Sequence, residues 1–210
     1  GFWRGVNVNP NAVYMECFID ELAQAAGKDA LAFREPLMKD NPLGWAVLQA
    51  AAERAGWATR EADGKFMGLS VCKAFGSYVA ACAEVSVDSA GRIRMERIVA
   101  ATDPGYAVNP QQVEAQVEGS FVYGLSALLY GECTVTDGAI DQRNFDTYQS
   151  LRMAQMPEVE TILMASGGFW GGVGEPTIAV AAPAVLNAIA AATGKRYRDV
   201  PLKNSDLQFA

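Results

Sequence analysis

The chain has 210 residues, 50% of them hydrophobic and 20% charged, and its formal net charge is −7. Nucleic-acid binders usually carry a basic face, so neither DNA nor RNA is expected as a partner of this acidic chain. No apolar run in the sequence is long enough to span a bilayer. The four cysteines form no C-x-x-C pair, and their spacing indicates neither a zinc nor an iron–sulfur site within the chain.

The sequence contains no histidine. This excludes Ser-His-Asp and Cys-His catalysis, and it also excludes metals held by histidine ligands. Acid–base chemistry in this chain must therefore use Glu, Asp, Lys, Tyr or Cys. A metal would have to arrive with its own ligands or be held by groups from elsewhere.

Helical patterns fill the first third of the sequence. Apolar residues recur at intervals of three and four, Asp29 precedes the second helix as a cap, and glycines follow the first and third helices. The predicted helices cover residues 11–26, 30–38 and 42–55. A polar stretch with a glycine, residues 60–65, then predicts a loop or a boundary between lobes.

Strand patterns fill the middle of the sequence. Turn residues separate three runs, and the second and third runs form a predicted hairpin around residues 88–91. Alternation in the third run places Ile93 and Val99 on one face of the sheet and Ile98 on the other. The predicted strands cover residues 66–74, 78–87 and 92–101.

The last part of the chain mixes both patterns. An Ala-rich helical run covers residues 178–192, and because proline fits the first turn of a helix and glycine its end, Pro183 and Gly194 place the last helix at 183–193. Helices and strands that do not alternate regularly predict an α+β fold with a mixed sheet. The other predicted elements are a helix over residues 110–130, a hairpin over 133–140 and a strand over 159–165.

A single carboxylate, Glu175, stands near the end of a glycine-rich turn at residues 171–176. Glycines carry no side-chain bulk, so a large flat ligand can approach the backbone there. The helix start that follows offers partial positive charge and free N–H groups. Glu175 could take a proton from a bound substrate. The plain alternative is a tight loop with a solvated glutamate in the first turn of a helix.

Two further polar clusters each precede or open a helix. One covers residues 3–10, and the other covers residues 103–110 and leads into Gln116. With the glycine-rich turn they offer amide side chains, backbone N–H groups, Arg4 and Glu175. That set suits a polar, anionic, planar cofactor better than a bare metal ion.

These residues resemble the molybdenum-binding large subunit of the xanthine dehydrogenase/aldehyde oxidoreductase family, and most closely its isoquinoline 1-oxidoreductase beta-subunit type. Each motif is weak alone, but the set runs in order over almost the whole chain. The motifs that carry the likeness are the Arg4-Gly5 pair, residues 18–23, residues 75–80, the Asn109-Pro110 pair, residues 116–119, residues 174–176 and residues 192–196.

The resemblance implies a molybdenum hydroxylase that carries molybdopterin in its cytosine dinucleotide form. Such an enzyme oxidises an N-heteroaromatic or aldehyde substrate, with water as the source of oxygen. A glutamate in the family's G-E-P motif acts as the base, and Glu175 matches it. Electrons leave through [2Fe-2S] clusters on a separate small subunit, which agrees with the lack of cysteine clusters in this chain.

The resemblance also implies cofactor-binding residues. Gln116 matches a position near the pterin, while Arg4 and Gly5 match a loop beside the metal and the substrate pocket. Gly172 and Gly174, in the glycine-rich turn, complete the expected cofactor contacts. No residue of the chain is expected to ligate the molybdenum, which the pterin holds.

The expected substrate pocket departs from the family pattern. Many relatives place an aromatic residue after the Arg-Gly pair, where this chain has Val6 and Asn7. The sequence therefore does not identify the substrate. Phe169 and Trp170, just before the glycine-rich turn, are candidates for pocket walls, with ordinary hydrophobic packing as the alternative.

The family's G-Q-G loop and the Gly-Ser-rich segment that grips the cofactor are absent from this sequence. In the isoquinoline type they belong to the N-terminal part of the subunit. We therefore expect this chain to be the C-terminal portion of a larger subunit, inactive when isolated. Within it we expect a helical segment after a cofactor/substrate loop (residues 1–60) and an α+β molybdopterin-binding lobe (residues 61–210), forming one continuous unit.

The expected partners are the N-terminal part of the same subunit, an iron–sulfur small subunit and a small-molecule substrate. Relatives of the isoquinoline type occur on either side of the bacterial inner membrane, so the expected location is either the cytoplasm or the periplasm. The alternative function is a non-catalytic fragment or degenerate relative that acts as an assembly module, although such a protein has no need of Glu175. A dinucleotide-binding fold is disfavoured because Gly172 and Gly174 are followed by Glu-Pro and not by x-x-Gly.

Overall fold

The computed structural model of the chain describes residues 3–61 and 65–210, and it has the predicted α+β fold. Residues 62–64 of the predicted loop lie outside the described residues. The helices are α1 (Val8–Ala25), α2 (Ala30–Leu37), α3 (Pro42–Ala55), α4 (Pro110–Tyr130) and α5 (Ile178–Thr193). The strands are β1 (Phe66–Ala74), β2 (Ser77–Val87), β3 (Ile93–Asp103), β4 (Val135–Thr136), β5 (Ala139–Ile140) and β6 (Glu158–Leu163). In the described part of the chain, no helix is both long and apolar enough to cross a membrane.

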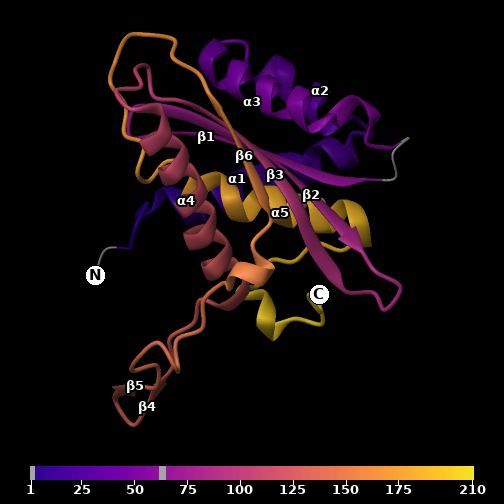
Figure 1. Cartoon of the computed structure of the whole chain (residues 1–210). Helices are drawn as coiled ribbons and strands as arrows, with labels where there is room; N and C mark the ends of the chain where they lie inside the picture. The colour runs from indigo at the N-terminus through magenta and orange to yellow at the C-terminus, as the bar shows by residue number, and fades with distance from the viewer. Residues whose placement is uncertain (1–2, 62–64) are drawn as a thin grey trace.

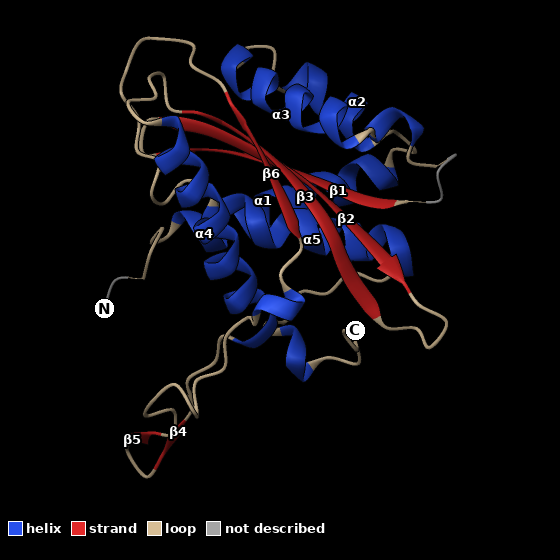
Figure 2. Cartoon of the chain, viewed as in Figure 1, coloured by secondary structure: helices blue, strands red, loops and turns tan. Residues whose placement is uncertain are grey.

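A four-stranded mixed sheet lies at the centre of the molecule, in the order β1-β2-β3-β6. The first three strands pair antiparallel, and β6 pairs parallel to β3 after the chain has passed through α4. Helix α3 covers one face, whereas α4 and α5 cover the other (Figures 1 and 2). Alternate residues of β2 enter the two cores: Val79 and Ala81 face α4 and α5, and Ala80 and Cys82 face α3.

The predicted hairpin at β4 and β5 is confirmed. It stands away from the body of the molecule, at the tip of the extended segment that follows α4 (Figure 1). The side chains of Val135 and Ile140 are 66% and 54% exposed. The hairpin therefore adds nothing to the two cores around the central sheet.

The predicted faces of the third strand are wrong. Ile93 packs in the same core cluster as Ile98, while Val99 packs in the cluster on the opposite face. The cause is a bulge in β3, where Arg97 pairs with Glu84 and Met95 pairs with Val85, so that Glu96 between them has no opposite residue in the β2 register. One extra residue reverses the alternation beyond it.

The predicted start of the last helix is also wrong. Helix α5 begins at Ile178, and Pro183 lies inside it rather than in its first turn. Proline in a helix interior lacks the N–H that would bond four residues back, and its ring crowds that turn. The carbonyl that loses its helical donor to Pro183 is that of Ala179, four residues back. In the same turn the buried Ser70 hydroxyl on β1 donates to the Val180 carbonyl at 2.9 Å, so the sheet contacts the helix directly there.

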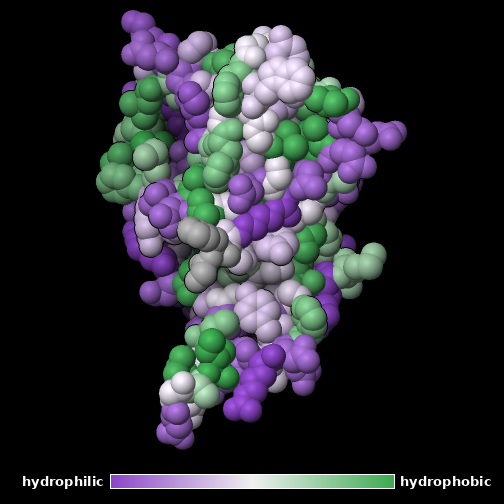
Figure 3. All heavy atoms as spheres, turned by 90° about the vertical axis from the view of Figure 1, so that its left-hand side faces the viewer, coloured by the Kyte–Doolittle hydropathy of each residue, from purple (hydrophilic) through white to green (hydrophobic). Residues whose placement is uncertain are grey.

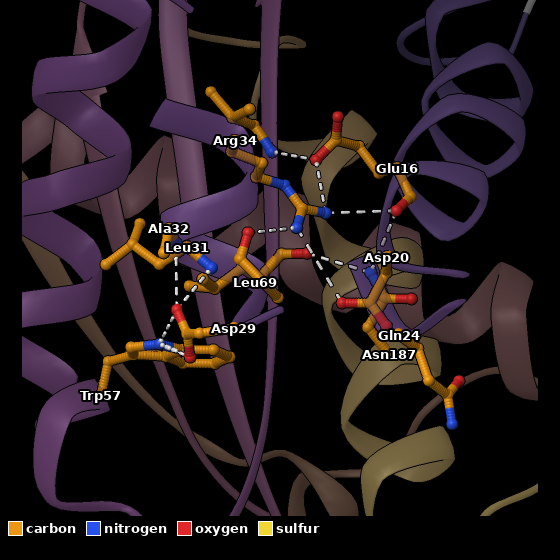
Figure 4. A network of polar contacts seen from close by, with 12 residues as sticks. Glu16, Asp20, Gln24, Asp29, Leu31, Ala32, Arg34, Trp57, Leu69 and Asn187 are labelled. Atoms are coloured by element: carbon orange, nitrogen blue, oxygen red, sulfur yellow. Dashed lines mark hydrogen bonds and ion pairs between the residues drawn. The ribbon is translucent and has the colours of Figure 1, made fainter. Parts of the chain in front are cut away.

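A buried polar network joins α1, α2 and β1 (Figure 4). The Arg34 side chain is 2% exposed and lies 3.5 Å from the Glu16 carboxylate, whose side chain is 7% exposed. Glu16 also accepts a hydrogen bond from the Val71 N–H of edge strand β1, at 2.9 Å. Asn187 of α5 donates to the main-chain carbonyls of Glu16 and Leu69. The carboxylate of Glu16 thus satisfies an edge-strand N–H that the sheet leaves without a strand partner.

Three of the four thiols are expected to resist alkylation in the folded protein. Burial raises the pKa of Cys17 and Cys82 to about 12 and that of Cys72 to about 11, whereas Cys133 is exposed. Because the thiolate is the reactive form, a higher pKa means less reactive sulfur at mildly alkaline pH. Iodoacetamide labelling followed by peptide mass mapping should modify Cys133 first, and the other three only after unfolding. Equal labelling of all four thiols in the native state would contradict the burial seen here.

Candidate functional site

Three segments meet beside the start of α5. They are the loop before α1, helix α4, into which the second polar cluster leads, and the glycine-rich turn at residues 171–176. Direct hydrogen bonds link five of the predicted site residues, which are Arg4, Gly5, Gln116, Gly174 and Glu175.

Glu175 is half-buried and oriented by the N-terminal loop. Its Oε1 accepts a hydrogen bond from the backbone N–H of Gly5 at 3.0 Å. Its own carbonyl accepts from the Ile178 N–H at 3.1 Å, in the turn that opens α5. One carboxylate oxygen is therefore fixed by the protein, and the structure shows no hydrogen bond to the other from any residue it describes. A carboxylate held in this way can accept a proton from a ligand beside it.

Arg4 connects these three segments through its guanidinium group. Nε donates to the Gly174 carbonyl at 2.5 Å, and Nη2 donates to Gln116 Oε1 at 2.9 Å and to the Ser120 hydroxyl at 3.2 Å. The guanidinium carbon also lies 5.2 Å from the centre of the Tyr123 ring, within cation–π range. The guanidinium thus holds the N-terminal loop, α4 and the glycine-rich turn in one arrangement.

The glycine-rich turn is anchored on its other side to the β1–β2 turn and to the loop after β3. Gly172 N–H donates to the Phe75 carbonyl at 2.9 Å, and its own carbonyl accepts from the Ser77 hydroxyl at 2.6 Å. Gly171 N–H donates to the Pro104 carbonyl at 2.8 Å. A side chain at Gly171 would place its Cβ 2.2 Å from the Ser77 hydroxyl oxygen, so the backbones can meet only because this residue is glycine.

Beyond these anchors, the backbone of the turn keeps free donors. Among residues 3–61 and 65–210, no acceptor receives the N–H groups of Val173, Gly174 or Glu175. A Cβ at Gly174 would stand 3.6 Å from Gln116 Oε1, an ordinary contact distance, so the turn passes close to α4 at this residue. Consecutive free N–H groups suit an anionic ligand.

The four residues of the predicted substrate pocket are exposed around this centre. Val6 and Asn7 follow Gly5 directly, and Val6 has φ +39°, which is uncommon for a β-branched residue. The side chains of Phe169 and Trp170 are 77% and 63% exposed. In the part of the chain that the structure describes, no hydrogen bond or ring contact joins Phe169 or Trp170 to Glu175. The two therefore border the glycine-rich turn and are not part of the hydrogen-bonded centre.

Aromatic side chains line the surface near this centre. The ring centres of Trp170 and Tyr106 lie 5.2 Å apart, and those of Trp3 and Tyr123 lie 5.6 Å apart. Figure 3 looks onto the side of the molecule that carries the N-terminus and α4, where hydrophobic side chains are exposed in several patches among hydrophilic ones. A surface of this kind suits contact with a partly apolar ligand or with further protein.

Sequence reasoning missed two polar residues of the site. Ser120 accepts from Arg4 and lies one helical turn after Gln116, a spacing that could have indicated the same face of α4. Asn9, within the first polar cluster, donates from Nδ2 to the Arg4 carbonyl at 2.9 Å. Nothing in the sequence distinguishes Asn9 from the neighbouring asparagines Asn7 and Asn11.

Comparison with known proteins gives the family. The model of the molybdopterin cofactor-binding domain matches residues 5–157. The chain is 31% identical to the isoquinoline 1-oxidoreductase subunit beta of Brevundimonas diminuta, over 96% of this chain and 26% of that protein. It is also 31% identical to a membrane-bound aldehyde dehydrogenase of Gluconacetobacter polyoxogenes, named for pyrroloquinoline quinone, over 99% of this chain and 29% of that protein.

A solved structure shares the fold. Quinoline 2-oxidoreductase from Pseudomonas putida 86 superposes with a TM-score of 0.53 at 23% identity, over 60% of this chain and 17% of that one. The chain thus spans between a quarter and a third of the length of the two curated relatives. The family-model match and the relatives show that this chain belongs to the molybdopterin cofactor-binding domain family, within the molybdenum-binding subunits of the xanthine dehydrogenase/aldehyde oxidoreductase type.

Proposed function

We propose that the chain forms part of a molybdenum hydroxylase that oxidises an N-heteroaromatic or aldehyde substrate, with water as the source of oxygen. Electrons would pass to [2Fe-2S] clusters on a partner subunit. The observation that carries the proposal is the fixed Glu175 carboxylate beside the free N–H groups of the glycine-rich turn. Family membership supports the same cofactor class.

The residues present fit a molybdopterin. The free N–H groups of residues 173–175 and the lack of side-chain bulk at Gly174 match the flat, anionic surface of such a cofactor. When bound, the cofactor supplies the redox centre and the activated oxygen, which side chains of this chain cannot provide. The proposal adds the cytosine dinucleotide form of the cofactor, as the resemblance to the isoquinoline type implies.

In this proposal the chain's own residues hold the cofactor and move one proton. Glu175 takes a proton through the carboxylate oxygen that receives no hydrogen bond from any described residue. Gln116, Gly172 and Gly174 border the cofactor, and Arg4 with Gly5 keeps the N-terminal loop against the turn. The remaining proposed residues form the substrate pocket, and these are Val6, Asn7, Phe169 and Trp170.

We propose that the chain supplies one side of this site and that the rest of a larger subunit completes it. The isolated chain should then bind the cofactor weakly and show no turnover. Stoichiometric molybdenum on the purified 210-residue chain would contradict this part of the proposal.

The test is the cofactor content of the native complex that contains this chain. The expected result is stoichiometric molybdenum, together with a pterin that releases cytidine monophosphate on hydrolysis. An intact, folded complex without molybdenum or pterin would favour an assembly module instead. Pyrroloquinoline quinone in place of the pterin would overturn the cofactor assignment, which makes it the necessary second assay given the name of one relative.

A further inference from the structure

We infer that Asn9 is a positioning residue for Glu175, acting through the peptide unit between Arg4 and Gly5. The carbonyl of Arg4 and the N–H of Gly5 belong to this one planar group. Asn9 Nδ2 donates to the carbonyl at 2.9 Å, and the N–H donates to Glu175 Oε1 at 3.0 Å. The peptide plane is thus held at both ends, with Asn9 on one side and Glu175 on the other.

This peptide unit needs an external restraint because the backbone around it is strained. Gly5 has φ +90° and Val6 has φ +39°, so two successive residues lie in the left-handed region. A β-branched residue such as Val6 rarely adopts that conformation without surrounding contacts that enforce it. If the plane rotated, the Gly5 N–H would turn away from the Glu175 carboxylate.

Asn9 fits the role sterically as well as chemically. Its amide lies so close to Gly5 that a Cβ there would stand 2.5 Å from Nδ2, so the side chain packs directly against the peptide it holds. The reversed amide orientation would bring two oxygen atoms together at the Arg4 carbonyl. The side-chain nitrogen is therefore the atom that must face this peptide.

The other end of the Asn9 amide argues against a purely structural role. Oδ1 is buried and accepts no hydrogen bond from any residue that the structure describes. An unsatisfied buried acceptor lowers the stability of the folded state. The buried Oδ1 thus costs stability, while the one hydrogen bond that the described residues give this side chain goes to the peptide that orients Glu175.

The inference rests on the proposed role of Glu175, and its test compares substitutions in the intact complex. Asn9→Asp keeps the shape but removes the donor. Because position 9 lies in the first turn of α1, where an acidic side chain is favourable, this change should not weaken the helix. Asn9→Leu removes the donor without adding charge. Asn11→Asp is the matched control, since Asn11 is exposed in the same helix.

Both Asn9 variants should lower kcat by about 10- to 100-fold, as expected from a small misplacement of a reacting group, with KM and molybdenum content close to wild type. A second readout is independent of turnover. Hydrogen–deuterium exchange of the Gly5 amide should become about tenfold faster, because a hydrogen bond that protects it is weakened. Asn11→Asp should change neither quantity.

The outcomes separate this inference from the proposed function. Unchanged kcat in both Asn9 variants would overturn the inference, as would loss of molybdenum and a lower melting temperature in parallel with kcat, the signature of a structural role. A variant Glu175→Gln measured alongside tests the proposed function by itself. If Glu175→Gln is inactive and the Asn9 variants are fully active, only the inference fails.

Discussion

Replacing Glu175 with glutamine in the complete enzyme is expected to lower turnover by about 10²- to 10⁴-fold, the usual contribution of one general base. Glutamine has nearly the same shape and keeps an oxygen that can accept the Gly5 N–H. It cannot take up a proton at neutral pH, however. Molybdenum and pterin content should therefore stay at the wild-type level while steady-state turnover collapses.

The matched control for this prediction is Glu118→Gln. Glu118 lies on α4, two residues after Gln116, and is exposed to solvent. The substitution makes the same chemical change near the same surface, but it removes no contact to the glycine-rich turn, so turnover should be unchanged. A Glu175→Gln enzyme that works at nearly the wild-type rate would exclude Glu175 as the base and leave the function of the fixed carboxylate unexplained.

Elements with strong local signals could be predicted from the sequence to within a few residues. Asp29 accepts hydrogen bonds from the Leu31 and Ala32 N–H groups at the start of α2, and Asn41 caps α3 in a similar way. Caps act over two or three residues, so a short sequence window contains all the information needed. The hairpin turns and the helix stops at Gly56 and Gly194 followed the same logic.

The errors came from long-range effects. The bulge in β3 depends on how that strand pairs with β2, and no residue type within β3 indicates where the extra residue lies. Pro183 lies inside α5, most of whose residues are buried, and the helix packs against β1 and α4, far away in the sequence. Rules for helix starts use neighbouring residues only and take no account of such packing.

In the candidate site, too, local patterns could be predicted and long-range contacts could not. Composition and family likeness selected the three clusters, but the contacts between them join residues far apart in sequence: Arg4 and Gly174 are separated by 170 positions. Pattern analysis therefore predicted which segments would contribute. It could not predict that Gly5 would orient Glu175, or that Asn9 would hold the peptide that does so.

A second large effect is expected from Arg34→Met, which should lower the free energy of unfolding by about 3–5 kcal/mol, the usual cost of leaving one partner of a buried ion pair alone. Arg34 lies 3.5 Å from Glu16, and both side chains are buried (Figure 4). Methionine fills much of the same volume, so the loss comes mainly from the uncompensated carboxylate. Chemical denaturation followed by circular dichroism measures it.

The stability lost in Arg34→Met should depend on pH in a defined direction. Burial raises the pKa of Glu16 above its ordinary value of 4.5, while the nearby Arg34 charge opposes that rise. A group with a raised folded-state pKa contributes stability below the unfolded value and loses that contribution as pH rises through the folded value. Without Arg34 the pKa rises further. The difference in free energy of unfolding between wild type and Arg34→Met should therefore be largest near neutral pH and shrink as pH falls toward 4.5.

The matched control is Arg54→Met, the same substitution in an exposed ion pair. The Arg54 side chain is 64% exposed, and its partner Glu160 also pairs with Arg97. Solvent screens such pairs, so this variant should lose far less stability and show little change in its deficit between neutral and acidic pH. Equal losses at positions 34 and 54 would mean that the Glu16 carboxylate is stabilised mainly by the Val71 N–H, and that the network between α1, α2 and β1 does not depend on its buried arginine.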